Sequence, residues 1–247
     1  MERMLATDLD GTFIGDDATM EELWGDLEEA GVSVVFSTGR HLPSIEGFYA
    51  RVATPRRADA CVTMVGTEIW HRRGDGYVLD DDWSEVITDR WDKAAVDAIV
   101  AAIPGTELQP EEWQSPFKSS YYLEEDAVTR LEELQRRLDE RDLAAKVVYS
   151  AARFLDLLPA RSGKGEAIRY LAGEVGIAPD DVITAGDTGN DLDMMRPELG
   201  FRSIAVGNAS AELAEHSADN VYHAAAQYAA GIREGLEHYG WLERPGS

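Results

Sequence analysis

Two short, mostly apolar runs with a helical segment between them constrain the fold of this chain more than any other feature. Residues 4–6 and 32–36 are typical of buried strands, and the segment between them carries apolar residues at helical spacing. A capping box of Thr19 with Glu22 predicts the start of the helix, and Gly31 predicts its end. Because a strand, a helix and a strand in this order form a right-handed crossover, the two strands must be parallel. The start of the chain therefore predicts an α/β fold.

The same alternation of strands and helices returns near the other end of the chain. The further segments that fit this sheet are strands over residues 60–65, 182–185 and 203–206 and helices over 164–175 and 226–238. The middle of the chain differs, because a hairpin turn at residues 71–76 is followed by another order of elements. The segments expected there are helices over 80–103 and 126–141 and strands over 118–123, 146–149 and 154–158.

These segments divide the chain into two expected domains. We expect both ends, residues 1–79 and 157–247, to share a doubly wound, mostly parallel sheet, and residues 80–156 to form an inserted α+β domain. Ligands bind at the carboxyl edge of such a sheet. The polar side chains that follow its strands are therefore the candidate functional residues.

The chain is strongly acidic. Its 23 Lys and Arg residues against 47 Asp and Glu residues give a net charge of −24, which disfavours binding to nucleic acid or to an anionic membrane. An anionic substrate would therefore need a local cation. The acidity has two interpretations, an adaptation to concentrated salt and the composition of an ordinary acidic protein.

The start of the sequence predicts a soluble, cytoplasmic protein. Asp8 comes too early for a signal peptide, and no apolar run approaches the roughly 20 residues that a membrane span needs. The single cysteine, Cys61, excludes an internal disulfide and favours a reducing compartment. It lies in a strand-like run, which favours a role in packing over a role as nucleophile.

Two carboxylates follow the first expected strand at a spacing of two residues. Side chains two apart on a strand share a face, so Asp8 and Asp10 can converge on one reacting phosphorus while Gly11 turns the backbone away. Asp, Gly and Thr also form ordinary turns. The motif Asp8-Leu9-Asp10-Gly11-Thr12 alone therefore does not separate a catalytic site from a solvated turn.

Three further polar motifs follow expected strands or begin expected helices. They are Ser37-Thr38-Gly39-Arg40, Ser162-Gly163-Lys164-Gly165 and Gly186-Asp187-Thr188-Gly189-Asn190-Asp191. The Thr38 hydroxyl and the neighbouring amides of Gly39 and Arg40 can bind phosphate oxygens. Lys164 opposes the helix dipole, which indicates an anion nearby, and Asn190 can orient a phosphate or the lysine. Each motif also has a structural interpretation, as a helix cap, a solvated lysine or an acidic loop.

Together these motifs meet the requirements of Mg²⁺-dependent phosphoryl transfer. Mg²⁺ takes oxygen ligands and keeps some waters, so Asp8, the Asp10 carbonyl and Asp187 can supply its protein ligands. Asp191 can contact the ion directly or hold a bound water. The cation and a lysine offset charge on the transferring group, one carboxylate can act as nucleophile, and a second can protonate the leaving sugar oxygen.

In this order the four motifs resemble those of the haloacid dehalogenase-like phosphatase superfamily. The resemblance implies that Asp8 is the nucleophile and Asp10 the acid/base. The residues that match the later motifs are Thr38, Lys164, Asp187 and Asp191. An aspartate at position 10 is typical of the phosphatases and phosphomutases of this superfamily. The insert over residues 80–156 then corresponds to the cap that closes over the substrate and excludes water.

The sequence is also similar to the sucrose-phosphate phosphatase family, from residue 4 to about residue 240. The segments that carry this likeness are Val65-Gly66-Thr67-Glu68-Ile69, Lys118-Ser119-Ser120-Tyr121-Tyr122, Asp156-Leu157-Leu158-Pro159 and Val206-Gly207-Asn208-Ala209. In this family the cap and the loop at residues 66–68 hold a disaccharide. The sugar-contacting residues that the resemblance implies are Thr67, Glu68, Gln114 and Lys118, and the other substrate-binding residues are Gly39, Arg40 and Asn190.

We therefore expect hydrolysis of a disaccharide phosphate, sucrose 6-phosphate first, and three alternatives stay open. Mannosylfructose-phosphate phosphatases resemble this sequence over its whole length, and glucose and mannose differ at one hydroxyl. A phosphomutase would share the first motif. A catalytically silent module associated with a sucrose-phosphate synthase is a different class, and the intact Asp8, Asp10, Lys164 and Asp187 favour the enzyme. The expected partners are a small sugar phosphate and, transiently, a sugar-phosphate synthase.

Overall fold

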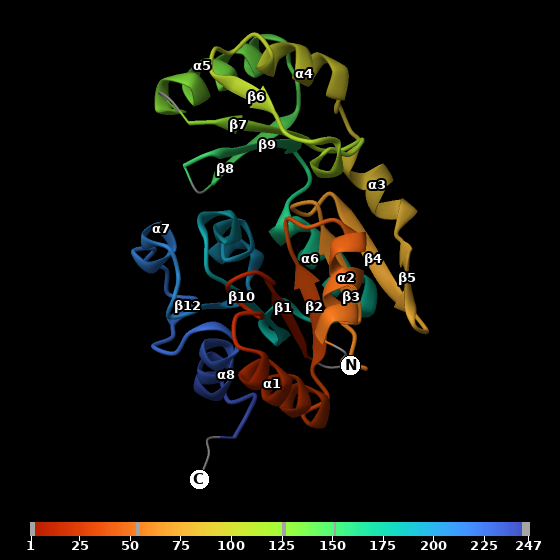
Figure 1. Ribbon diagram of the computed structural model, residues 1–247, viewed down its shortest axis with the longest axis vertical. Helices are drawn as coiled ribbons and strands as arrows, with labels where there is room; N and C mark the ends of the chain where they lie inside the picture. Colours follow the sequence, from red (N-terminus) through yellow and green to blue (C-terminus); the bar gives the residue numbers. More distant parts are fainter. Residues whose placement is uncertain (1–2, 53–54, 125–126, 151, 244–247) are drawn as a thin grey trace.

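The computed structural model describes residues 3–52, 55–124, 127–150 and 152–243, and these residues form two sheets (Figure 1). In the larger sheet the strands lie in the order β12, β11, β10, β1, β2, β3, β4 and β5. Their bounds are β1 Met4–Thr7, β2 Ser33–Ser37, β3 Ala60–Thr63, β4 Glu68–Arg73, β5 Gly76–Leu79, β10 Val182–Gly186, β11 Arg202–Ala205 and β12 Val221–His223. All pairings from β12 to β3 are parallel, whereas β4 and β5 are antiparallel to their neighbours. The expected doubly wound, mostly parallel sheet is confirmed.

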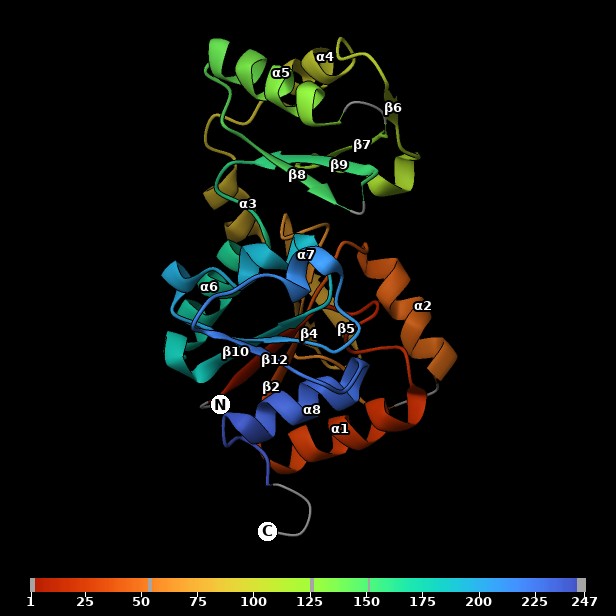
Figure 2. The same ribbon diagram turned by 90° about the vertical axis from the view of Figure 1, so that its left-hand side faces the viewer.

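Helices cover both faces of the larger sheet. Along β1, Leu5 belongs to one hydrophobic cluster and Met4 and Ala6 belong to another, because successive side chains point to opposite faces. The helices that pack on the first face are α1 Asp17–Glu29, α2 Leu42–Val52 and α8 Tyr228–His238, and those on the second are α3 Asp81–Ile87 and α6 Lys164–Val175 (Figure 2). Burial on both faces explains the apolar runs of the central strands.

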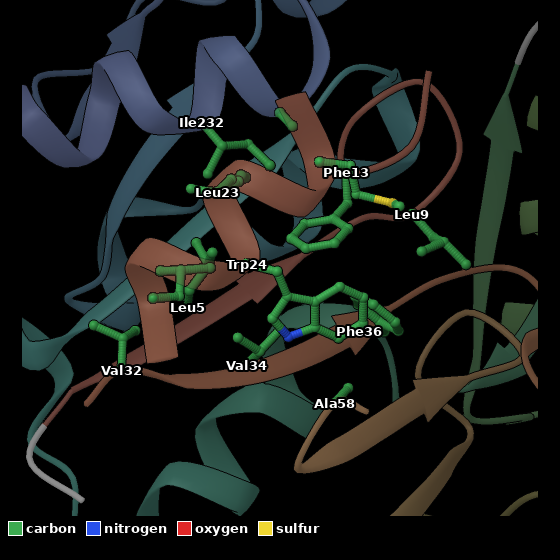
Figure 3. Packing of buried hydrophobic residues seen from close by; sticks show 14 of the residues in the cluster. Leu5, Leu9, Phe13, Leu23, Trp24, Val32, Val34, Phe36, Ala58 and Ile232 are labelled. Atoms are coloured by element: carbon green, nitrogen blue, oxygen red, sulfur yellow. The ribbon is translucent and has the colours of Figure 1, made fainter. Parts of the chain in front are cut away.

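Three aromatic rings pack together under the loop that follows β1. The Phe13 ring centroid lies 5.1 Å from that of Trp24 and 5.2 Å from that of Phe36, in edge-to-face contacts (Figure 3). Phe13 and Leu9 are both fully buried. These two side chains fix the loop after β1 to the hydrophobic core and so hold the position of its polar residues.

The first helix begins before the predicted capping box. The carboxylate of Asp16 accepts a hydrogen bond from the amide of Thr19 at 2.8 Å, and α1 starts at Asp17. The box of Thr19 with Glu22 was wrong as a helix start, because an acidic side chain three residues earlier already caps the free amide. The predicted end is confirmed, since Gly31 has a φ of 67° directly after α1.

The single helix expected over residues 80–103 is two helices, α3 and α4 Lys93–Val100. Asp80 caps α3 by accepting from the amide of Trp83, and Asp92 caps α4. Between them Arg90 has a φ of 56°, which breaks the helical path. The break lets α3 pack on the larger sheet while α4 packs on the smaller one.

The smaller sheet is antiparallel, with the strand order β6, β7, β9 and β8. The bounds of its strands and of the helix beside α4 are β6 Thr106–Leu108, β7 Ser119–Leu123, β8 Ala145–Ser150, β9 Phe154–Pro159 and α5 Ala127–Glu140. Both helices pack on one face, around Tyr121, Leu155 and Leu157, and the other face is directed toward the larger sheet (Figures 1 and 2). The predicted start of α5, Asp126, lies outside the described residues.

The packing of β9 and α3 favours domain boundaries a few residues beyond the expected ones. β9 pairs with β7 and β8, so the boundary at residue 156 passes through a strand of the smaller sheet. Trp83 and Ile87 of α3 belong to a hydrophobic cluster of the larger sheet. We propose that the inserted domain spans residues 88–159, and we call it the cap; residues 1–87 and 160–247 then form the core domain.

The remaining helices are short. They are α7 Ala211–Ala214 and the 3₁₀ helices η1 Glu111–Trp113, η2 Pro179–Asp181, η3 Gly189–Met194 and η4 Pro197–Leu199. No helix within the described ranges combines the length and the hydropathy that crossing a membrane requires.

Cys61 lies within β3 and is fully buried. Burial raises the pKa of its thiol to about 12, so the thiol stays protonated near neutral pH. The structure supports the packing role expected for this residue.

Candidate active site

The four polar motifs meet at the carboxyl edge of the larger sheet. Asp8 directly follows β1, Thr38 directly follows β2, and the segment from Asp187 to Asp191 follows β10. Lys164 is the first residue of α6, as the sequence predicts. The sheet order places β1 between β2 and β10, so motifs that are far apart in the sequence become neighbours.

A buried lysine lies at the centre of these motifs. The Nζ of Lys164 donates to Oδ1 of Asp8 at 2.7 Å and to Oδ1 of Asp191 at 2.7 Å. It also donates to Oδ1 of Asn190 at 3.2 Å. The Lys164 and Asp191 side chains are completely buried, and that of Asp8 is 9% exposed. The ammonium group therefore connects the first and fourth motifs in a space from which water is largely excluded.

Burial and the repulsion of neighbouring carboxylates raise the pKa values of Asp8 and Asp187. The pKa of Asp8 is raised to about 8, because burial and the charge of Asp191 outweigh the opposing effect of Lys164. The pKa of Asp187 is raised to about 6, mainly by burial and by Asp191. Burial lowers the pKa of Lys164, but the two carboxylates raise it further, so it stays charged. The site thus holds more carboxylates than cationic side chains.

Asp8, Asp187 and Asp191 can together hold a cation. One ligand oxygen from each lies within 4.8 Å of the others. The hydroxyl of Thr12 orients Asp187 by donating to its Oδ1 at 3.0 Å. A Cβ at Gly11 would lie 2.4 Å from Oδ2 of the same carboxylate, so the loop after β1 needs glycine there. The oxygen donors and the excess of negative charge fit Mg²⁺.

Asp191 is occupied by hydrogen bonds on both oxygens. Its Oδ1 accepts from Lys164, and its Oδ2 accepts from the amides of Asp187 and Thr188 at 3.0 Å each. These bonds close the turn that follows β10. Two roles were left open for Asp191, direct contact with the ion and the binding of a metal-bound water. Because both of its oxygens already accept hydrogen bonds, the second role is favoured.

Asp10 forms an ion pair with Arg40. Both of its carboxylate oxygens accept from Arg40, Oδ2 from Nε at 2.7 Å and Oδ1 from Nη2 at 2.5 Å. The Asp10 side chain is 55% exposed and that of Arg40 is 18% exposed. Thr38 fixes the same turn, because its hydroxyl oxygen accepts from the amide of Arg40 at 3.2 Å. The second motif thus positions the carboxylate of the first.

A cavity of about 700 Å³ separates these motifs from the cap. The predicted residues that line it are Asp8, Asp10, Thr38, Gly39, Arg40, Lys118 and Asn190. Lys118 reaches it from the cap with a 3% exposed side chain, and its Nζ lies 3.3 Å from Oδ1 of Asp156. The cap therefore contributes a positive charge opposite the carboxylates of the core.

Three predicted sugar-contacting residues do not line the cavity. Thr67 is buried, and its hydroxyl donates to the carbonyl of Met64. Oε2 of Glu68 accepts from the Thr63 hydroxyl at 2.8 Å. The amide group of Gln114 is used in hydrogen bonds to the cap backbone. Each of these side chains thus has a hydrogen-bond partner within the protein, and its contact with a sugar stays a prediction.

The loop at residues 64–67 instead supports the lysine motif. A Cβ at Gly66 would lie 2.1 Å from the carbonyl carbon of Gly163, so the two backbones are in close contact beside Lys164. From this loop it is Val65 that lines the cavity.

Sequence reasoning missed several cap residues that line the cavity. They are Gln109, Trp113, Tyr122, Ser150, Phe154 and Asp156. A signal existed for two of them, because Phe154 and Asp156 alternate along β9 with Leu155 and Leu157, which pack in the cap core. The strand period therefore indicates that these two side chains point away from the cap core.

Replacing Lys164 by methionine should strongly destabilise the Mg²⁺-free protein. The change leaves Asp8 and Asp191 as buried carboxylates without their ammonium partner, at an expected cost of about 3–5 kcal/mol in the free energy of unfolding. Urea unfolding followed by circular dichroism measures this cost. The matched control is Lys93→Met in the cap, where the half-exposed ion pair with Asp97 should contribute about 1 kcal/mol or less. Equal costs for the two variants would contradict the central role of Lys164.

The chain is similar to several phosphatases over nearly its whole length. It is 33% identical to the mannosylfructose-phosphate phosphatase of Agrobacterium fabrum, over 96% of this chain and 97% of that protein. It is 32% identical to sucrose-phosphatase 2 of Nicotiana tabacum over 95% of this chain, but the match spans only 58% of the tobacco protein.

Solved structures share this fold. The sucrose-phosphatase from Synechocystis sp. PCC6803 in complex with sucrose and phosphate superposes with a TM-score of 0.88 at 30% identity, covering 97% of this chain and 98% of the other. A haloacid dehalogenase (HAD) subclass IIB sugar phosphatase, BT4131, superposes with a TM-score of 0.68 at 18% identity, which shows the fold alone. The family model described as sucrose-6F-phosphate phosphohydrolase matches residues 1–240. This chain therefore belongs to the sucrose-6F-phosphate phosphohydrolase family.

Proposed function

We propose that this protein is a Mg²⁺-dependent phosphatase that hydrolyses sucrose 6-phosphate to sucrose and phosphate through an aspartyl-phosphate. The observation that carries this proposal is Asp8, which is held by the buried Lys164 beside Asp191 and lines a cavity whose opposite wall belongs to the cap. Membership of the sucrose-6F-phosphate phosphohydrolase family supports the same reaction.

Asp8 is the proposed nucleophile. Lys164 holds its Oδ1, and within the described residues no hydrogen bond is made to its Oδ2, which leaves this oxygen for attack on phosphorus. The bond between phosphorus and the sugar oxygen breaks as the bond to Asp8 forms. Asp8 and Asp187, with the Asp10 carbonyl, would hold Mg²⁺, which when bound offsets negative charge on the phosphoryl group.

Asp10 is the proposed acid and base. Arg40 holds its carboxyl group at the wall of the cavity, next to the space open to the substrate. Because both oxygens of Asp10 accept from Arg40, this pair must open and Asp10 must take up a proton before Asp10 can protonate the departing sugar oxygen. In the second step Asp10 takes a proton from the water that attacks phosphorus. The second attack releases phosphate and restores Asp8. Thr38 and Asn190 line the same wall and can donate to phosphate oxygens.

The cavity supports a disaccharide phosphate as substrate. Its volume of about 700 Å³ lies within the range of small-molecule sites, and the cap supplies both aromatic and polar side chains. A flat ring such as Trp113 can pack on a sugar face while Lys118 and Asp156 hydrogen-bond hydroxyl groups. The alternative is mannosylfructose phosphate, which the similarity to the Agrobacterium enzyme supports. A cytoplasmic location and association with a sugar-phosphate synthase stay predictions.

Asp8→Asn should abolish phosphate release from sucrose 6-phosphate, with a loss of at least about 10³-fold in kcat, because an amide cannot replace the nucleophile. Phosphate release at saturating Mg²⁺ measures this, and circular dichroism verifies the fold of the variant. The control is Asp180→Asn at an exposed position before β10, which should keep full activity. Activity in Asp8→Asn within tenfold of the unchanged protein would refute the role of Asp8.

Mg²⁺ should raise the thermal unfolding temperature of this protein, because a cation relieves the repulsion among the buried carboxylates. Asp187→Asn should remove most of this rise, and the exposed control Asp219→Asn should keep it. Differential scanning fluorimetry with and without Mg²⁺ measures the effect without any substrate. An unchanged rise in Asp187→Asn would show that the ion binds elsewhere.

The substrate is tested by a phosphate-release panel of sucrose 6-phosphate, mannosylfructose phosphate, glucosylglycerol phosphate and simple hexose phosphates. We expect the highest kcat/KM for sucrose 6-phosphate. Lys118→Met should raise KM for the disaccharide phosphate about tenfold, the effect of one lost charged hydrogen bond, and should leave p-nitrophenyl phosphate hydrolysis unchanged. Lys93→Met in the cap is the control. A flat substrate profile would refute a disaccharide as the preferred substrate, whatever the outcome for Asp8→Asn.

A further inference from the structure

A second group of side chains with the geometry to hold a metal ion lies at the β4 side of the larger sheet, apart from the strands that carry the four polar motifs. His71 belongs to β4, Asp80 follows β5, and Glu174 belongs to α6. The Nε2 of His71 lies 2.8 Å from Oδ2 of Asp80 and 3.7 Å from Oε2 of Glu174. One ligand atom from each residue lies within 4.8 Å of the others.

Each carboxylate in this group has one oxygen held in place by a neighbour. Oδ1 of Asp80 accepts from the amide of Trp83 at 2.9 Å, and Oε1 of Glu174 accepts from the hydroxyl of Tyr170 at 3.3 Å. The rings of Trp83 and Tyr170 pack with their centroids 5.0 Å apart, which fixes both donors. The remaining oxygens, Oδ2 of Asp80 and Oε2 of Glu174, are therefore directed at the same imidazole nitrogen, as outer hydrogen bonds direct the ligands of metal sites.

A single proton on His71 cannot be shared with both carboxylates. A proton on Nε2 of His71 can be donated to Asp80 at 2.8 Å, but Glu174 at 3.7 Å is beyond hydrogen-bond distance. The Asp80 side chain is only 7% exposed, so its charge is poorly solvated. A divalent cation in place of the proton would contact all three ligand atoms and offset both carboxylates.

We propose that His71, Asp80 and Glu174 form a binding site for Zn²⁺. Zn–N and Zn–O bonds at tetrahedral angles separate neighbouring ligand atoms by about 3.3–3.6 Å, and the separations of 2.8 and 3.7 Å from His71 lie on either side of this range. An imidazole ligand favours Zn²⁺ over Mg²⁺. All three residues line an open cavity of about 410 Å³, which gives the ion an entry path and room for a water ligand. The site is distinct from the three carboxylates around Lys164.

The ion would join three elements of the core domain. Asp80 caps α3, the helix through which the chain leaves the core domain for the cap. Glu174 belongs to the helix that begins with Lys164. Bound Zn²⁺ would thus fix α3 and α6 to β4, and its expected effect is on stability and not on the chemical step.

Thermal unfolding of the full chain in saturating Mg²⁺, with and without Zn²⁺, tests the site. At about 100 times its Kd, Zn²⁺ should raise the unfolding temperature by about 5–10 °C. His71→Gln and Glu174→Gln should each lose this rise. Glu174 is partly exposed on a helix, so its variant keeps the test valid if His71→Gln does not fold.

Two controls separate this site from other zinc ligands. His223→Gln removes an exposed histidine elsewhere and should keep the rise, and Asp187→Asn removes a carboxylate of the active site and should also keep it. Co²⁺ should give a visible absorption band in the unchanged protein that disappears in His71→Gln. The proposal is overturned if Zn²⁺ gives no rise in the unchanged protein, if the rise persists in both His71→Gln and Glu174→Gln, or if Asp187→Asn abolishes it.

Discussion

The ammonium group of Lys164 is the interaction on which the catalytic end of this molecule depends. It joins Asp8 after β1 to Asp191 after β10, and it reaches both from the start of α6. All three side chains are buried, so each would be costly to keep in place without the others. The start of a helix disfavours a lysine, but the two carboxylates more than compensate for this effect. The sheet order, the helix start and the turn after β10 must therefore all be correct before any one of these residues can occupy its position.

The same interaction leaves the site short of positive charge. Three carboxylates face one ammonium group, which suits a site that admits a divalent cation and then a phosphate ester. Two cationic side chains that line the cavity pair with other carboxylates. Arg40 pairs with Asp10, and Lys118 lies beside Asp156 in the cap. Charge is thus divided between a buried centre in the core domain and a second position across the cavity, where a sugar could be recognised.

The sequence predicted the larger sheet because its central strands are buried on both faces and so consist of apolar runs. It predicted the residues around Lys164 because each motif directly follows a strand or begins a helix. The sequence could not show that Thr67 and Gln114 hydrogen-bond to the backbone around them, since these contacts form only in the folded chain. We place the cap boundary at residue 159 and not at 156, because β9 runs to Pro159 and no change in composition marks its end. Alternation along that strand was the signal available for Phe154 and Asp156.

The ion pairs of Lys164 are buried, whereas the pair of Arg40 with Asp10 is partly exposed. The two should therefore respond differently to a change in ionic strength. At about 1 M salt, charges in solvent are screened over about 3 Å, so the half-exposed Asp10 pair and the repulsion among surface carboxylates both weaken. The ion pairs of Lys164 with Asp8 and Asp191 are buried, so salt screens them much less. Rising salt would therefore relax the surface of this acidic chain and weaken the hold of Arg40 on Asp10, while the position of Asp8 stays fixed.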